Sequence, residues 1–341
     1  MSKLIIVESP AKAKTIKNFL GSEYVVIASK GHIRDLPKSS FGIKVDGDKF
    51  TPEYRISSDH SALVKEIKAL ASKADEIYLA TDEDREGEAI AYHIATAIGK
   101  KPETLPRIVF HEITKTAIEA ALANPRVLDM NSVNAQQARR LLDRIVGYKL
   151  SPLLNIKIQR GLSAGRVQSA ALKILVDKER EIRDFKPIEY FSIDTKFKKD
   201  LEAELVQFQG SKIEKLTITN PQRAEFILNI LKSDKFQINE IESKERKTNA
   251  QPPFMTSTLQ QSASNRLGFS PKKTMMLAQS LYEGVQTNSG FMGAITYMRT
   301  DSLNIAKEAL KAAREIIKSE YGADHLLKRV LIYASFTRGE D

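Results

Sequence analysis

Short apolar runs alternate with amphipathic segments through the first third of the chain. In sequence order, strand-like and helix-like stretches cover residues 4–7, 12–20, 24–28, 63–70, 77–80 and 89–98. Parallel strands need a crossover of about a dozen residues or more, which a helix usually supplies. The alternation therefore predicts an α/β layer built on a largely parallel sheet. Residues 31–54 interrupt it with two prolines and several glycines, which indicates a loop on the rim of the sheet.

The remainder of the chain changes pattern twice. A helical stretch begins at Asn131 and another covers residues 163–182, whereas residues 190–242 carry apolar side chains at period two, as half-buried antiparallel strands do. Two helices are expected at 256–267 and 271–282, the second with Ser270 as its N-cap. We therefore expect a multidomain protein of α/β plus α+β class. The expected domains cover residues 1–130, 131–188, 189–252 and 253–341.

The charge balance favours a polyanionic partner. The 341 residues include 53 Lys and Arg against 43 Asp and Glu, a net charge of +10, which points to nucleic acid and to salt-sensitive association. The absence of cysteine excludes disulfides, thiol catalysis and zinc–cysteine sites. Because no apolar segment is long enough to cross a bilayer and no secretory signal is visible, we expect a cytoplasmic protein without a membrane partner.

An acidic stretch, Thr81 to Glu88, follows the apolar run at 77–80. Like charges a few ångströms apart repel, and a divalent cation bound to the carboxylate oxygens relieves the repulsion. In an extended strand end, Asp82 and Asp84 project to the same face, and Mg²⁺ takes one or two carboxylates while it keeps positions for water and phosphate. The stretch therefore predicts a Mg²⁺ site. The alternative is that Asp84, Glu86 and Glu88 only fill the first turn of a helix, where negative charge suits the dipole.

Glu8 closes the first predicted strand, so it lies at the edge of the sheet where open α/β folds bind their ligands. A serine–proline pair then starts a helix that carries Lys12 and Lys14 in its first turn, where the dipole disfavours cations. Either a phosphate docks there or both lysines lie in solvent. His32 follows the second strand in a loop, where it can reach a ligand or belong to an ordinary rim.

Residues 295–302 have the pattern of a short strand that runs into a turn, with Ser302 placed to cap the helix that follows. Tyr297 and Arg299 then share one face. A phenol is a poor nucleophile at neutral pH, and a neighbouring guanidinium favours the phenolate and neutralises an attacked phosphate. The alternative is that Tyr297 merely packs in the core.

Four segments together resemble bacterial DNA topoisomerase I, of the type IA topoisomerase family. They are residues 5–16, 80–90, 160–169 and 295–302, in the order that the family shows. The resemblance runs from about residue 3 to about residue 322. It implies a Rossmann-like Toprim domain with a mainly parallel sheet, a helical DNA-groove domain, a β-rich arch segment and a helical domain that bears the tyrosine. Because the family continues past the tyrosine, the chain is expected to be a shortened, amino-terminal portion of the core.

The resemblance also assigns roles to individual residues. It implies that Tyr297 attacks the DNA backbone, that Arg299 stabilises the attacked phosphate, and that Glu8 and Lys12 assist proton transfer to the leaving 3′ oxygen. The Mg²⁺ ligands that it implies are Glu8, Asp82, Asp84 and Glu86. The positions that it implies near single-stranded DNA are His32, Arg160, Arg166 and Gln168.

The implied activity is ATP-independent relaxation of negatively supercoiled DNA, by cleavage of one strand through a 5′-phosphotyrosine link, strand passage and Mg²⁺-dependent resealing. No Gly-x-x-x-x-Gly-Lys-Ser/Thr loop occurs, which agrees with independence from ATP. The resemblance further implies a monomer that acts on single-stranded segments of duplex DNA in the bacterial cytoplasm, at the nucleoid. The alternatives are an inactive fragment that only binds single-stranded DNA, a Toprim nuclease or primase that uses no tyrosine, and a reverse gyrase.

Overall fold

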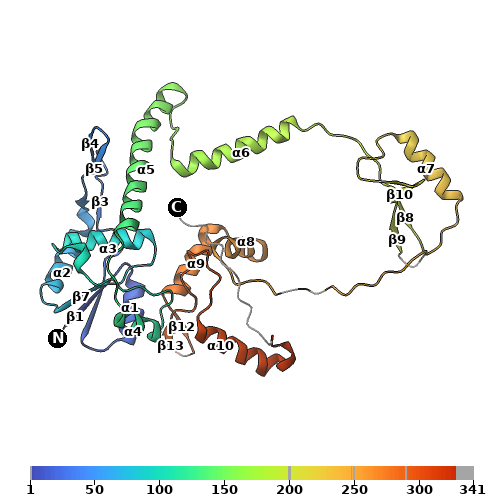
Figure 1. The fold of residues 1–341 in the computed structure, drawn as a ribbon. Helices are drawn as coiled ribbons and strands as arrows, with labels where there is room; N and C mark the ends of the chain where they lie inside the picture. The colour runs from blue at the N-terminus through green and yellow to red at the C-terminus, as the bar shows by residue number, and fades with distance from the viewer. Residues whose placement is uncertain (1, 199–200, 247, 249, 289, 328–341) are drawn as a thin grey trace. The chain divides into compact units, whose positions relative to one another are not determined.

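The chain folds as two compact units. A computed structural model describes residues 2–198, 201–246, 248, 250–288 and 290–327 (Figure 1). The first unit comprises Met1–Gly165 and Ala250–Asp341, and the second comprises Arg166–Asn249. Residues 328–341, which end the predicted tyrosine-bearing domain, lie outside the described residues. None of the helices in the described part is both long and apolar enough to span a bilayer.

A three-stranded parallel sheet forms the centre of the first unit. Strands β1 (Lys3–Val7), β2 (Tyr24–Ala28) and β7 (Glu76–Leu79) pair in the order β2–β1–β7. Leu4 faces Val25 on one side and Ile77 on the other, and both pairings are parallel. Helices α1 (Pro10–Phe19) and α2 (Ser61–Ala71) lie in the crossovers, and α3 (Arg85–Ala97) follows β7. This confirms the predicted α/β layer with a parallel sheet.

Helices cover both faces of the sheet because successive strand residues point to opposite sides. Leu4 and Ile6 pack with residues of α2 and α3, such as Ile67 and Ile94. Ile5 and Val7 pack instead with α1 and with α4 (Lys115–Ala123). These aliphatic strand residues are almost completely buried. Full burial of each such side chain stabilises the fold by about 1.5–3 kcal/mol, so the two clusters hold the strand ends in fixed positions.

The stretch 31–54 is more regular than the predicted loop. Strand β3 (Arg34–Asp35) pairs antiparallel with β6 (Arg55–Ile56), and β4 (Ile43–Asp46) pairs antiparallel with β5 (Lys49–Pro52). Gly47 supplies the positive φ of +57° that the tight turn between β4 and β5 requires. The glycine that suggested a loop therefore forms the turn of a hairpin.

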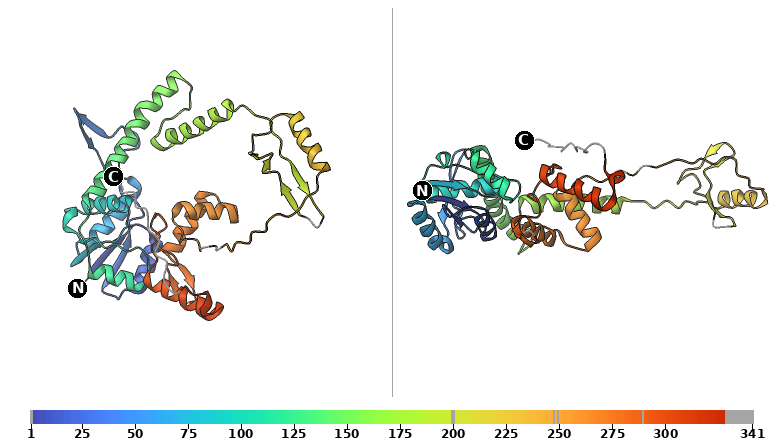
Figure 2. Two further views of the ribbon diagram at one scale, coloured as in Figure 1. Left: turned by 45° about the vertical axis from the view of Figure 1, so that its right-hand side comes forward. Right: turned by 90° about the horizontal axis from the view of Figure 1, so that it is seen from below.

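Further α-helices belong to the first unit. They are α5 (Met130–Lys157), α8 (Thr256–Leu267), α9 (Pro271–Glu283) and α10 (Lys307–Ile316). The Ser270 hydroxyl accepts the Lys273 N–H and caps α9, as predicted. A hairpin of β12 (Val285–Thr287) and β13 (Gly290–Met292) follows α9, and Figure 2 shows it beside the blue amino-terminal layer. Single turns lie at Ser58–His60, Pro102–Thr104, Ile317–Tyr321 and Ala323–His325.

The second unit contains a helix that the sequence pattern did not predict. The unit begins with α6 (Arg166–Asp184), and short antiparallel strand pairs follow this helix. These strands are β8 (Asp194–Lys196), β9 (Glu202–Glu204), β10 (Gln207–Phe208) and β11 (Ser211–Lys212). Helix α7 (Pro221–Ser233) then packs Ile227 against Ile193 and Ile218. The Asn220 side chain caps α7 and Pro221 occupies its first turn, so the start signal lies in the sequence.

The predicted strand at residues 295–302 is wrong. These residues form irregular bends, and α10 begins after Ala306 without a side-chain cap from Ser302. The Thr256 hydroxyl donates to the carbonyl oxygens of Met298 and Thr300 at 2.8 and 3.1 Å, and it accepts the Thr300 N–H at 2.9 Å. Side-chain hydrogen bonds to the start of α8 therefore hold this segment in place of a strand partner.

Candidate active site

Glu8, Lys12 and Asp82 form a buried ion triplet at the carboxyl edge of the sheet. The Lys12 Nζ atom is 2.5 Å from Glu8 Oε1 and 2.6 Å from Asp82 Oδ1. The Asp82 N–H donates to Glu8 Oε2 at 2.6 Å, which ties the ends of β1 and β7 together. Lys12 is completely buried, so the interpretation of this side chain as a solvated surface lysine is wrong. The carboxylates of Glu8 and Asp82 offset its charge.

Burial and charge together shift the pKa values of this triplet. Burial disfavours the ammonium of Lys12, but the two carboxylates outweigh it and raise the pKa of Lys12 above its usual value. Burial raises the pKa of Glu8 to about 7, although the neighbouring Lys12 favours the carboxylate. The Phe110 and Tyr282 rings flank the ammonium, with centroids 5.5 and 5.3 Å from Nζ. Lys12 is therefore a fixed cation whose ammonium is shielded from bulk water.

Tyr297 meets the acidic stretch at Asp84. The Tyr297 hydroxyl donates to Asp84 Oδ2 at 2.6 Å, and the Arg299 Nη1 atom is 3.5 Å from the same oxygen. Burial, the nearby Asp82 charge and the hydrogen bond to Asp84 raise the pKa of Tyr297 and outweigh the opposite effect of Arg299. The hydroxyl is therefore protonated in this arrangement. Tyr297 and Arg299 converge on one carboxylate although no strand places them on a common face.

The remaining acids of the stretch point to different partners. Asp84 Oδ1 accepts the Gly87 N–H at 2.8 Å and caps α3. Glu86 Oε2 accepts a hydrogen bond from Gln136 of α5 at 2.9 Å and lies 3.1 Å from His32 Nε2. The hydrogen bond with His32 lowers the pKa of Glu86. Gln136 was not among the predicted site residues; its signal in the sequence is a polar side chain about one helical turn after the apolar, buried Val133.

A cavity of about 510 Å³ lies against the acidic stretch. Glu8, Asp82, Asp84 and Glu86 all line it, and Met275, Met276 and Met298 lie along other parts of its wall. Within the described residues, no three histidine or acidic side chains converge as a ready-made metal cage. Mg²⁺ needs no such cage, since it usually takes one or two carboxylates and fills its other positions with water and phosphate oxygens. The hard oxygen donors of this cavity fit that pattern.

The residues that the family resemblance places near DNA belong to different parts of the fold. His32 lines it, whereas Arg160 is in the loop that follows α5 in the first unit. Arg166 and Gln168 are in the first turn of α6, in the second unit, and their side chains are exposed.

Comparison with known proteins assigns the family. The family model described as DNA topoisomerase matches residues 127–336, and that of the Toprim domain matches residues 3–113. The chain belongs to the DNA topoisomerase family. It is 73% identical over 336 residues to DNA topoisomerase 1 of Campylobacter jejuni, and the match covers 98% of the chain and 48% of that relative. It is 60% identical over 335 residues to DNA topoisomerase 1 of Helicobacter pylori, and the match covers 98% of the chain and 46% of that relative.

A solved structure supports the same assignment. Full-length topoisomerase I from Thermotoga maritima superposes with a TM-score of 0.80 at 47% identity, over 94% of this chain and 53% of that one. The chain thus spans about half the length of the topoisomerases that it matches. The predicted type IA resemblance and the predicted fold class, with a Toprim layer and additional helical and small antiparallel parts, are confirmed.

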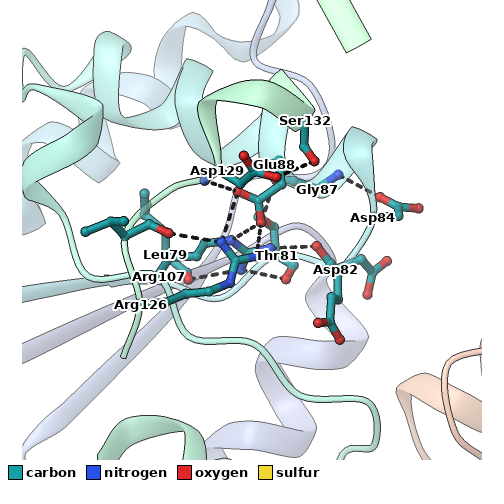
Figure 3. Close-up of polar contacts among 12 residues, drawn as sticks. Leu79, Thr81, Asp82, Asp84, Gly87, Glu88, Arg107, Arg126, Asp129 and Ser132 are labelled. Atoms are coloured by element: carbon teal, nitrogen blue, oxygen red, sulfur yellow. Dashed lines mark hydrogen bonds and ion pairs between the residues drawn. The ribbon is translucent and has the colours of Figure 1, made fainter. Parts of the chain in front are cut away.

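A buried arginine holds the acidic loop of this topoisomerase-family chain (Figure 3). The Arg107 guanidinium donates to the carbonyl oxygens of Leu79, Thr81 and Asp82, at 3.2, 2.8 and 2.6 Å. Its Nε donates to Glu88 Oε1 at 3.1 Å. Arg107 thus fixes the backbone between β7 and α3, and the Glu88 carboxylate neutralises the Arg107 guanidinium. Glu88 is therefore a structural member of the acidic stretch, unlike the acids that line the cavity.

Replacement of Arg107 by methionine is expected to destabilise the first unit by about 3–5 kcal/mol, because the carbonyl groups of Leu79, Thr81 and Asp82 lose their side-chain donor and Glu88 keeps only the partly exposed Arg126 as its ion-pair partner. Urea unfolding followed by circular dichroism measures the change. Arg126→Met is the control, because the Arg126 side chain is partly exposed and Glu88 keeps Arg107 as its partner, so this change should cost clearly less. An Arg126→Met variant as unstable as Arg107→Met would contradict the account.

A second, more basic cavity of about 320 Å³ adjoins the first. Its lining includes His32 and Glu86, which line both cavities, together with Arg34, Arg139 and Arg140. Its wall also contains His93, which is 2% exposed and packs edge-on against the rings of Tyr54 and Tyr92. Burial, helped by the charge of Arg34, lowers the pKa of His93 to about 3.

His93 is expected to make the fold sensitive to acid. Its pKa is about 3 in the folded chain and 6.5 as the reference value, so between these pH values the unfolded chain binds more protons. The stabilisation is therefore complete above pH 6.5 and falls with decreasing pH by up to about 1.4 kcal/mol per unit. Between pH 7.5 and 5.5 the wild type should lose about 1–1.5 kcal/mol more than His93→Phe in urea unfolding. Parallel pH curves for the two proteins would contradict the prediction.

Proposed function

We propose that the chain carries the cleavage and resealing centre of an ATP-independent topoisomerase that relaxes negatively supercoiled DNA. The observation that carries this proposal is the hydrogen bond of 2.6 Å between the Tyr297 hydroxyl and Asp84. Asp84 lines the cavity together with Glu8, Asp82 and Glu86, so this bond connects the proposed nucleophile to the acidic cavity. The similarity to bacterial topoisomerase I supports the same role.

In the proposed reaction the Tyr297 oxygen attacks a phosphorus atom of one DNA strand and gives its proton to Asp84, which already accepts its hydrogen bond. A bond from phosphorus to the tyrosine oxygen forms, and the bond to the 3′ oxygen of the preceding nucleotide breaks. The product is a 5′-phosphotyrosine ester and a free 3′ hydroxyl, which reverses the step during resealing. Arg299, which lines the cavity, is proposed to neutralise the attacked phosphate. Glu8 and Lys12 are proposed to supply the proton that the 3′ oxygen takes up, which suits the raised pKa of Glu8.

Glu8, Asp82, Asp84 and Glu86 are the residues that would hold Mg²⁺ in this cavity. When bound, Mg²⁺ neutralises phosphate charge and so aids alignment of the two DNA ends for resealing. Its ligands would be hard carboxylate oxygens, which this ion prefers.

The DNA partner is proposed to be a single-stranded segment of negatively supercoiled duplex. His32, Arg160, Arg166 and Gln168 are the proposed contacts, and the net charge of +10 favours a polyanion. We propose that the protein works as a monomer at the nucleoid in the cytoplasm. The bacterial relatives and the lack of a membrane-spanning helix among the described residues agree with this location.

Trapping of a covalent adduct tests the proposal. The chain is incubated with a single-stranded oligonucleotide labelled at its 3′ end, or at its 5′ end, and then denatured. A 5′-phosphotyrosine link keeps the 3′ label on the protein and releases the 5′ label on a shorter strand. The opposite label pattern would overturn the proposed polarity, and no adduct with either label would overturn the proposed cleavage.

A second candidate function is binding of single-stranded DNA without cleavage. It is favoured by one observation, that burial and the nearby Asp82 and Asp84 carboxylates raise the pKa of Tyr297 and keep its hydroxyl protonated, a form that is a poor nucleophile. The two candidates differ in the same experiment, because a binding module retards both oligonucleotides in a native gel but leaves no label on denatured protein.

A further inference from the structure

The side-chain amide of Asn155 ties the loop after α5 to the last turns of that helix. Its Nδ2 atom donates to the Ser151 carbonyl and to the Leu162 carbonyl, each at 2.7 Å. Its Oδ1 atom accepts the Gly161 N–H, also at 2.7 Å. One side chain thus uses both amide donors and its carbonyl oxygen to bridge helix and loop.

Ser151 adds a second connection one helical turn earlier. Its hydroxyl oxygen accepts the Ala164 N–H at 3.1 Å and lies 3.5 Å from the Ala164 carbonyl oxygen. Gly161 has a φ of +88°, a backbone conformation that favours glycine and that reverses the chain direction sharply. The loop is therefore held at residues 161, 162 and 164 by two polar side chains of α5.

Arg160 directly precedes the residues that these bonds hold. Its side chain is exposed, and a guanidinium offers five N–H donors in a rigid plane that matches phosphate oxygens. A loop that is already ordered loses less conformational entropy when it binds than a loop that must become ordered first. Fixation of Gly161 therefore favours binding of an anion by Arg160 although Asn155 itself carries no charge.

We propose that Asn155 is a positioning residue for DNA binding, which orders the loop so that Arg160 meets a backbone phosphate. The proposal rests on the proposed function, in which Arg160 contacts single-stranded DNA. It adds that an uncharged side chain sets part of the affinity. A purely structural role of Asn155, as a stabiliser of the end of α5, would lower the melting temperature but would not depend on Arg160.

The test measures binding of the full chain to a fluorescent single-stranded oligodeoxythymidine by anisotropy at several salt concentrations. Arg160→Ala is expected to weaken binding and to lower the salt slope by about one phosphate contact. Asn155→Ala is expected to weaken binding about threefold to tenfold with an unchanged salt slope, because no charge is removed. In the double variant the effect of Asn155→Ala should vanish, since the two residues act through one contact. Hydrogen exchange of the Gly161 amide should accelerate in Asn155→Ala.

Asn124→Ala is the matched control. The Asn124 side chain also donates to a helix carbonyl, that of Ala120 at 3.0 Å, but it lies at the end of α4. Its removal should leave DNA affinity unchanged. Ser151→Ala serves as a second variant should Asn155→Ala fold poorly, and it should weaken binding in the same direction with an unchanged salt slope.

The outcomes separate this inference from the function on which it rests. If Arg160→Ala weakens binding but Asn155→Ala and Ser151→Ala do not, the positioning role is overturned and the DNA contact of Arg160 stands. Equal effects of Asn155→Ala with and without Arg160 would overturn it as well. If Arg160→Ala leaves affinity unchanged, the assignment of this loop to DNA fails, and the positioning role fails with it.

Discussion

Tyr297→Phe should lower the yield of covalent DNA adduct by at least about 10³-fold, because no other group can replace the attacking oxygen. The ring stays in place, packed edge-on against Tyr282 at 5.2 Å, so the substitution removes one oxygen and little else. Loss of the hydrogen bond to Asp84 should cost only about 1 kcal/mol of stability. Affinity for single-stranded DNA should change less than about twofold, because it depends on cationic contacts.

Adduct yield on a denaturing gel, anisotropy and a melting curve check these three expectations together. Tyr24→Phe is the matched control: Tyr24 is a half-buried tyrosine at the first residue of β2, at the opposite end of the strand from the acidic cavity. It should leave the adduct yield unchanged. An adduct that persists in Tyr297→Phe at the wild-type yield would show that another residue attacks the DNA, and the proposed site would be wrong.

The sequence predicts that Glu8 and the Asp82 segment lie at one edge of the sheet, because the rule behind this prediction is local. Glu8 and the Asp82 segment each follow a buried strand, and parallel neighbours bring the carboxyl ends of their strands to one edge. The structure joins them through the Asp82 N–H and Glu8 at 2.6 Å. The same rule cannot predict that Lys12 is buried. Helical periodicity shows which face of a helix packs inward, but it does not show which charged side chains lie opposite that face.

The contact between Tyr297 and Asp84 has no local signature. The two residues are 213 positions apart, and the segment that carries Tyr297 is held by Thr256 and not by a strand ladder. Only the order of four family motifs suggested that the segments meet. The missed helix α7 has a different cause: its capping Asn220 and Pro221 are visible, but the period-two pattern upstream favoured strands for the whole region.

Gly87→Ala is expected to lower the rates of cleavage and resealing about 100-fold or more, by displacement of the acidic loop. A Cβ atom at Gly87 would lie 2.0 Å from the Asp82 carbonyl oxygen and 2.8 and 2.9 Å from its backbone carbon and nitrogen. These are backbone atoms, so no side-chain rotation relieves the overlap. Forced overpacking of this kind also destabilises a fold by about 1–3 kcal/mol.

Gly147→Ala is the control for the loss of a glycine as such. Gly147 lies within α5, and a Cβ atom there would meet nothing within 4 Å. Alanine should therefore stabilise this helix by about 0.5–1 kcal/mol and leave the adduct rate unchanged. Rapid-mixing measurements of adduct formation and of resealing after salt addition give the two rates, and urea unfolding gives the stability.

The effect of Gly87→Ala on the two reaction rates should exceed its effect on stability. The backbone atoms that it displaces hold Asp82 and Asp84 in place beside Tyr297. The Asp82 carbonyl accepts from Arg107 at 2.6 Å, the Asp82 N–H donates to Glu8, and the Gly87 N–H donates to the same Asp84 carboxylate that binds Tyr297. A shift of the loop by about 1 Å therefore moves Asp82 and Asp84 relative to Tyr297, and misplacement of that size can cost about 100-fold in rate. If Gly87→Ala instead kept the wild-type rates, the position of this loop would not matter for the chemistry, and the assignment of its acids to the site would be wrong.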